Sequence, residues 1–140
     1  MLDLLNDNLR FELIVHLNGK MLHDSSLFRF FSLQFLSDLT FSLKRETFDI
    51  NDIILEEDTE GDRLHYITKG NVMLLHKKSA TYIAEVSIDT FIGEIAFFTG
   101  EPRRATAKSQ NITEVLTLMK EDFLNAAKKD QKQLEIVEGI

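Results

Sequence analysis

A segment in the second half of the chain combines a glycine, a carboxylate and two arginines. Gly93 and Glu94 open it, and Arg103 and Arg104 follow one short apolar stretch later. A carboxylate accepts hydrogen bonds from sugar hydroxyls, and a guanidinium pairs with anionic oxygens in a planar, charge-assisted geometry. Glycine allows close backbone approach, and successive backbone amides can form a nest for an anion. These residues predict a site for a small ligand that carries both a ribose hydroxyl and a phosphate.

The segment from Phe91 to Thr106 resembles the phosphate-binding cassette of cyclic nucleotide-binding domains, with no insertion. The resemblance implies that Glu94 accepts from the ribose 2′-hydroxyl and that Arg103 pairs with an exocyclic phosphate oxygen. It implies a ligand, cAMP or cGMP, and no cofactor. The remaining contacts to the phosphate and ribose would come from Gly93, Ile95, Ala96, Arg104, Ala105 and Thr106.

The base of the nucleotide requires an apolar wall, for which Leu74, Ala84 and Val86 are the candidates. Arg104 stands where relatives commonly carry alanine or a small hydroxyl residue, and the hydroxyl is associated with guanine recognition. This difference slightly favours cAMP over cGMP as the expected ligand and leaves the choice of base open.

Other interpretations of the same residues exist. Arg103, Arg104, Ala105 and Thr106 also fit a phosphorylation site on an exposed turn, with Thr106 as the acceptor, or a basic surface turn without a partner. A third alternative is an interaction module that kept the fold and lost the ligand. Such modules usually lack the carboxylate or the arginine, and this chain has both.

Composition bounds the class of protein. The chain has 140 residues, is 44% hydrophobic and carries a formal net charge of −7, which fits one globular domain and argues against a nucleic-acid partner. It has no cysteine, and its four histidines lack metal-ligand spacing. No arrangement of Ser or Thr with His and Asp suggests a nucleophile, so we expect no metal site, no catalytic residue and no enzyme.

We interpret the acidic run Glu56–Asp62 as a solvated loop, and no apolar stretch predicts membrane insertion.

Apolar periodicity predicts an α+β fold, a β-roll between N-terminal and C-terminal helices. Leu9, Leu13, Leu17 and Met21 mark one helical face, and Ser32 can open a second helix that carries Phe35, Leu36, Leu39 and Leu43. The whole chain, 1–140, is expected to be one domain, with helices over 1–45, a roll over 46–119 with the cassette at 91–106, and C-terminal helices over 120–140 that stop short of a full lid. Short strands are predicted at Ile53–Leu55, Leu64–Thr68, Val72–His76, Thr81–Val86 and Glu114–Met119.

A second segment, Asp52 to Val72, resembles the first half of the family's roll. The chain departs from the family pattern at two turns. Ile50–Asn51 stands in place of the usual Pro–Gly, and Asp58 stands in place of a glycine. Because Asn and Asp tolerate left-handed backbone conformations, we expect both turns to form.

A third segment resembles the helix that enters this domain in cyclic-nucleotide-regulated cation channels. It comprises Asn8–Leu13, His16–Leu17 and Leu27–Phe28. The resemblance implies a cytoplasmic domain of a membrane protein that gates a tetrameric channel through its pore and linker region, while the isolated piece is expected to be monomeric. A kinase regulatory subunit is the alternative. A bacterial transcription factor is least favoured, because no DNA-binding helical module follows the roll.

Overall fold

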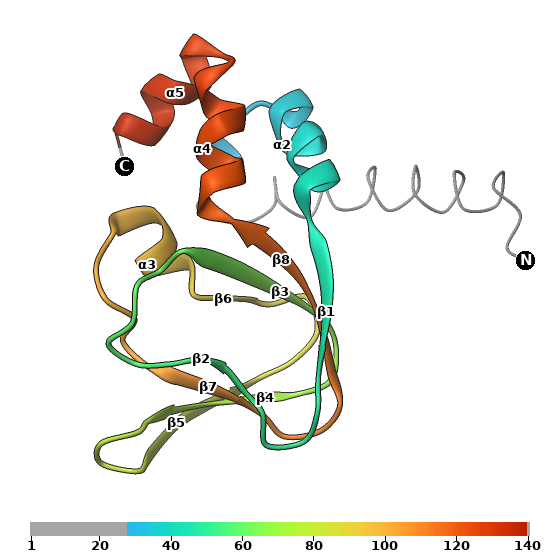
Figure 1. The fold of residues 1–140 in the computed structure, drawn as a ribbon, viewed down its shortest axis with the longest axis vertical. Coiled ribbons are helices and arrows are strands. Elements are labelled where there is room, and N and C mark those ends of the chain that lie inside the picture. The colour runs from blue at the N-terminus through green and yellow to red at the C-terminus, as the bar shows by residue number, and fades with distance from the viewer. Residues whose placement is uncertain (1–27, 140) are drawn as a thin grey trace, which may run out of the picture. The chain divides into compact units, whose positions relative to one another are not determined.

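The computed structural model describes residues 28–139, which divide into a helical unit and a β unit (Figure 1). The helical unit holds residues 28–43 and 122–139, and the β unit spans Lys44–Glu121. The predicted first helix, with Leu9, Leu13, Leu17 and Met21, lies outside the described residues.

The β unit is a roll of two antiparallel four-stranded sheets, which confirms the predicted α+β class. One sheet has the order β1-β8-β3-β6 and the other β2-β7-β4-β5 (Figure 1). A short helix, α3 (Glu94–Thr99), connects β6 to β7 through a turn. The strands are β1 Lys44–Phe48, β2 Ile53–Leu55, β3 Arg63–Lys69, β4 Val72–His76, β5 Thr81–Val86, β6 Phe91–Ile92, β7 Thr106–Ser109 and β8 Thr113–Met119.

All five predicted strand segments form strands, as β2, β3, β4, β5 and β8. Of the strands that were not individually predicted, β6 has only two residues, and β1 and β7 lack an apolar run. The sequence of β1 is Lys-Arg-Glu-Thr-Phe, and this strand pairs only with β8 at the edge of its sheet. The sequence of β7 is Thr-Ala-Lys-Ser, yet the strand is largely buried between β2 and β4.

The core of the roll is filled by apolar side chains from both sheets. Ile67 and Val115 are register partners on β3 and β8, and Leu55 and Ala107 are partners on β2 and β7. All four are buried and belong to one cluster. Their burial removes apolar surface from water and holds the two sheets together.

Four residues of the roll other than glycine have left-handed backbones, and two of them, Asn51 and Asp58, lie at the turns where the chain departs from the family pattern. Asn51 has φ 70° and Asp58 has φ 65°. These are the positions where the family pattern carries glycine, so the expectation that Asn and Asp support these turns is confirmed. Gly70 is left-handed as well (φ 91°), and a Cβ there would lie 2.6 Å from the carbonyl oxygen of Ile112.

The helical unit begins with a short 3₁₀ turn, η1 (Phe28–Phe30), followed by α2 (Leu33–Leu39). Ser32 caps α2, since its hydroxyl accepts from the amide of Phe35 at 3.1 Å. The predicted helix from Ser32 is therefore confirmed. It continues only through η2 (Thr40–Ser42), so Leu43 lies beyond its end in extended conformation.

The C-terminal part folds as two helices, α4 (Lys120–Lys128) and α5 (Gln131–Glu138). In the helical unit Phe123 of α4 packs edge-on against three aromatic rings, with centroid distances of 6.3 Å to Phe28, 5.7 Å to Phe31 and 6.0 Å to Phe35. Gln133 of α5 is buried and accepts from the amide of Ser32 at 3.1 Å. Of the apolar residues predicted for the second helix, Phe35, Leu36 and Leu39 are buried in this core, and Leu43 is half-buried.

One histidine is buried inside the roll. His65 on β3 is 2% exposed, and its Nδ1 lies in a hydrogen bond 2.8 Å from the hydroxyl of Thr117 on β8. Burial lowers the pKa of His65 to about 4, and the neighbouring Arg103 and Arg63 act in the same direction against Glu46. The neutral ring is therefore the form that the fold selects.

We expect the free energy of unfolding to decrease as the pH falls from about 6.5 to about 4, because the unfolded chain protonates His65 and the folded chain does not. The shift corresponds to roughly 3 kcal/mol. Urea unfolding between pH 7 and pH 4 should show a flatter pH dependence for His65→Gln than for the unchanged protein. Equal pH dependence in the unchanged protein and His65→Gln would contradict this prediction.

Candidate ligand-binding site

Gly93 joins β6 to α3 and cannot be replaced without strain. Its φ is 84°, in the left-handed region that favours glycine. A Cβ at this position would collide with Nη1 of Arg103. Gly93 therefore provides both the turn into α3 and the space beside the arginine.

Arg103 is a buried cation, 5% exposed, on the turn between α3 and β7. Its Nη2 donates to the carbonyl oxygen of Arg63 at 3.0 Å and lies 3.7 Å from Oδ1 of Asp62. Its Nη1 is buried and has no hydrogen-bond partner within the described part of the chain. Burial lowers the pKa of Arg103, and the carboxylate of Asp62 opposes that shift.

An arginine does not lose its charge in a protein, so an unused buried donor has to be explained. A charged donor without an acceptor is costly in a water-poor environment. An anionic oxygen placed at Nη1 would satisfy the donor and neutralise the charge. Arg103, Asp62, Arg63 and His65 also line a cavity of about 350 Å³.

Glu94 is the first residue of α3 and is half-buried. Its carboxylate forms no hydrogen bond or ion pair with residues 28–139, and burial raises its pKa. A carboxylate held in this state is available to accept a hydrogen bond from a ligand hydroxyl.

The structure separates the other predicted cassette residues into buried and exposed positions. Ile95 is 48% exposed, whereas Ala96 is buried against Gly61, where a Cβ would lie 2.6 Å from the carbonyl oxygen of Ala96. Arg104 is exposed and donates to Oε2 of Glu101 at 2.9 Å. Ala105, between Arg104 and Thr106, is half-buried.

Thr106 is fully buried, and its hydroxyl accepts from the amide of Glu57 at 3.1 Å. A phosphorylation acceptor needs an exposed hydroxyl. The structure therefore argues against the alternative in which Thr106 is modified on an exposed turn.

The three candidates for the base wall share one face of the β4–β5 pair. Leu74 lies directly opposite Ala84, and Val86 is paired with Val72. Leu74, Ala84 and Val86 are all half-buried, and Leu74 and Val86 pack against the core cluster. The structure brings these three together as an apolar surface, and their contact with a base stays a prediction.

Sequence reasoning missed the residues that hold Arg103 in place. The amide of Arg103 donates to the carbonyl oxygen of Thr59 at 2.9 Å, and the amide of Asp58 donates to the carbonyl oxygen of Arg103 at 2.8 Å. These partners lie in the acidic run that we interpreted as a solvated loop. Its glycine, Gly61, was the only local signal, and that glycine packs on α3 rather than only making a turn.

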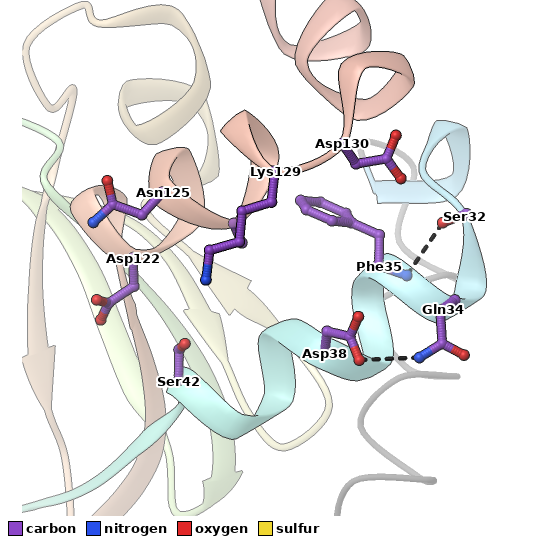
Figure 2. Close-up of a pocket in the computed structure, with 10 residues that line it drawn as sticks. Ser32, Gln34, Phe35, Asp38, Ser42, Asp122, Asn125, Lys129 and Asp130 are labelled. Atoms are coloured by element: carbon purple, nitrogen blue, oxygen red, sulfur yellow. Dashed lines mark hydrogen bonds between the residues drawn. The ribbon is translucent and has the colours of Figure 1, made fainter.

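A second hollow lies within the helical unit, between α2 and α4 (Figure 2). It has a volume of about 580 Å³ and is lined by Asp38, Asp122, Asp130 and Lys129 among others. Asp38 already accepts from Gln34 at 3.0 Å, and Asp130 accepts from the amide of Lys132 at 3.1 Å. Unlike the surroundings of Arg103, this hollow contains no buried donor or acceptor left without a partner among the described residues.

Residues 28–139 contain neither a cluster of metal-binding side chains nor a helix that could span a membrane. No group of three His, Asp or Glu side chains is placed to hold a metal ion. No helix in this range is long and apolar enough to cross a membrane.

Residues 45–130 match the cyclic nucleotide-binding domain family, so the chain belongs to that family. The match spans the roll, the cassette with Gly93, Glu94 and Arg103, and α4. No sequence among the curated proteins matched the chain.

Solved structures show the same fold. The N-terminal domain of a transcriptional regulator from Streptomyces coelicolor A3(2) superposes with a TM-score of 0.71 at 24% identity, covering 84% of each chain. A cyclic nucleotide-binding-like protein from Brucella abortus superposes with a TM-score of 0.69 at 21% identity, covering 79% of this chain and 97% of the other. Neither is described as a channel, and at these identities the similarity establishes the fold alone.

Substitution of Gly93 should disturb Arg103 in a way that a matched glycine does not. Gly93 and Gly100 both have left-handed backbones, with φ 84° and 77°, but a Cβ at Gly100 would meet no heavy atom within 4 Å. We expect Gly93→Ala to lower the free energy of unfolding by about 1–3 kcal/mol more than Gly100→Ala, measured by urea denaturation. Equal losses in the two variants would show that Arg103 does not fill the space beside Gly93.

Proposed function

We propose that this domain binds a cyclic nucleotide, cAMP or cGMP, in the cassette between β6 and β7, and that it acts as a sensor rather than an enzyme. The observation that carries the proposal is the buried Nη1 of Arg103, which has no partner in the described part of the chain. The cyclic phosphate would supply the missing acceptor, and Glu94 would accept from the ribose 2′-hydroxyl.

Other cassette residues would complete the ligand shell. We propose that the backbone amides near Ile95, Ala96, Arg104 and Ala105 surround the phosphate. Thr106, whose hydroxyl already accepts from the amide of Glu57, would form a buried wall of the site. The half-buried surface of Leu74, Ala84 and Val86 would contact the base.

Binding would regulate a larger assembly through a change of conformation. A ligand shifts a conformational equilibrium only by its differential affinity for the two states. We propose that residues 1–140 act as one domain, in which the C-terminal helices close over the base and pass the change to the N-terminal helices.

The partner we propose is the pore and linker region of a tetrameric cation channel, with this domain on the cytosolic side. The support for a channel is the sequence of Asn8–Leu13 and His16–Leu17, which resembles the helix that enters channel domains. A kinase regulatory subunit is the alternative for a sensor of this fold.

Calorimetric titration with cAMP and with cGMP tests the proposed function. We expect saturable binding that Arg103→Ala weakens roughly 100-fold, because removing one partner of a buried charge pair costs several kcal/mol. Glu94→Gln should weaken binding roughly tenfold through the loss of a charged acceptor. The matched control, Arg45→Ala, removes a half-exposed arginine on β1 and should leave affinity unchanged.

The thermal unfolding of each variant must be recorded beside its titration. Binding that survives Arg103→Ala would contradict the assignment of the phosphate to this residue. A folded, unchanged protein that gives no heat with either nucleotide would favour the ligand-independent interaction module instead.

A further inference from the structure

The loop after β2 carries acidic side chains that pair with basic side chains of the β4–β5 hairpin. Three consecutive acidic residues, Glu56–Asp58, face a histidine and two lysines, His76–Lys78. We call these six residues the charge ladder. Its pairs are Glu56 Oε1 with Lys77 Nζ at 3.2 Å, Glu57 Oε1 with His76 Nδ1 at 2.6 Å, and Asp58 Oδ2 with Lys78 Nζ at 3.0 Å.

The same loop is bonded on its other side to the turn that carries Arg103. The amide of Glu57 donates to Thr106 Oγ1 at 3.1 Å, and the amide of Asp58 donates to the carbonyl oxygen of Arg103 at 2.8 Å. The amide of Arg103 returns a bond to the carbonyl oxygen of Thr59 at 2.9 Å. The loop therefore connects the hairpin to the backbone of Arg103 through contacts that all involve residues 56–59.

The charge ladder combines two exposed pairs with one that is better shielded. An exposed ion pair alone contributes little to stability. The side chain of Glu57, however, is only 12% exposed, and because a carboxylate can only accept, Nδ1 of His76 must donate to it. Three neighbouring pairs also share the entropic cost of ordering one loop and one hairpin.

The backbone conformation of Asp58 gives its pair with Lys78 a further role in the turn. Asp58 adopts a left-handed φ of 65°, a conformation that aspartate tolerates less readily than glycine. Its hydrogen bond to Lys78 raises the pKa of that lysine and so favours the charged ammonium group. A glycine would form this turn without strain, but it would have no side chain to reach the hairpin.

We propose that the charge ladder is a positioning element for Arg103, and that Lys77 and Lys78 set the ligand affinity of a site they do not touch. This inference rests on the proposed function of Arg103 in nucleotide binding. Loss of the pairs would free the loop, loosen the two backbone bonds at Arg103 and broaden the positions its guanidinium occupies. Preorganisation lost in this way lowers affinity.

The first test needs no ligand. Hydrogen exchange at the amides of Asp58 and Arg103, followed by NMR, should be about fivefold faster in the double variant Lys77→Ala/Lys78→Ala. The control is Arg45→Ala, which breaks a pair of 3.4 Å with Glu114 between β1 and β8, on the other sheet. Exchange that is unchanged in the double variant, or equally accelerated in the control, would overturn the proposal.

The second test is affinity for cAMP with a charge swap. The double lysine variant should bind about fivefold more weakly. Glu56→Lys and Lys77→Glu should each weaken binding, and their combination should restore it, which a merely structural effect of either side chain would not do. Failure of the swap to restore affinity would contradict the proposal. If the unchanged protein binds no nucleotide, the proposed function fails, and the exchange comparison still decides whether the charge ladder holds Arg103.

Discussion

The buried guanidinium of Arg103 constrains the residues that surround it. Arg103 is 5% exposed, and its protein partners, the carbonyl oxygen of Arg63 and the carboxylate of Asp62, engage Nη2 alone. Leaving Nη1 without an acceptor is unfavourable for the isolated domain. The fold tolerates that cost because the surrounding contacts fix the arginine: Gly93 leaves it space, and the loop at Asp58 bonds its backbone. This arrangement is destabilising without an anion and becomes favourable with one.

A β-roll can hold such a group because it joins segments that are distant in sequence. The loop at Asp58 and Thr59 precedes Arg103 by more than forty residues, yet the strand before the loop, β2, and the strand after Arg103, β7, are hydrogen-bonded neighbours in one sheet. The contact of Gly61 with Ala96 fixes α3 in the same way. Local propensity makes each turn, but only the sheet register brings the turns together. The pairing of the strands therefore determines where the residues of the candidate site lie.

The same distinction explains what the sequence could predict. The strands β2, β3, β4, β5 and β8 have local apolar runs, and the cap at Ser32 and the turns at Asn51 and Asp58 depend on local backbone chemistry, so all of them were predictable. The strand β7 was not, because its small polar residues are buried only through pairing with β2 and β4. The acidic run is the largely exposed loop that was predicted, but its pairing was not predictable: its partners, His76–Lys78, lie on another strand pair, and no local pattern specifies that contact. The family, which residues 45–130 match, was predictable from the spacing of Gly93, Glu94 and Arg103, but the loop that bonds to the backbone of Arg103 was not.

The proposed function asks an acidic chain to bind an anion, which requires a positive potential at the site itself. With a net charge of −7, the mean potential of this protein opposes a phosphate. The loop whose backbone bonds to Arg103 carries three acids, Glu56–Asp58, and each is paired with a side chain of the hairpin. Pairing with a basic side chain reduces the negative field that these acids add near the guanidinium. The carboxylate that opposes the cation directly is Asp62, whose Oδ1 lies 3.7 Å from Nη2 and leaves Nη1 without a partner in the described part of the chain. Under the proposed function, Nη1 would be the cationic donor for a phosphate, and Glu94, which is unpaired within the described residues, would be the acceptor for a hydroxyl.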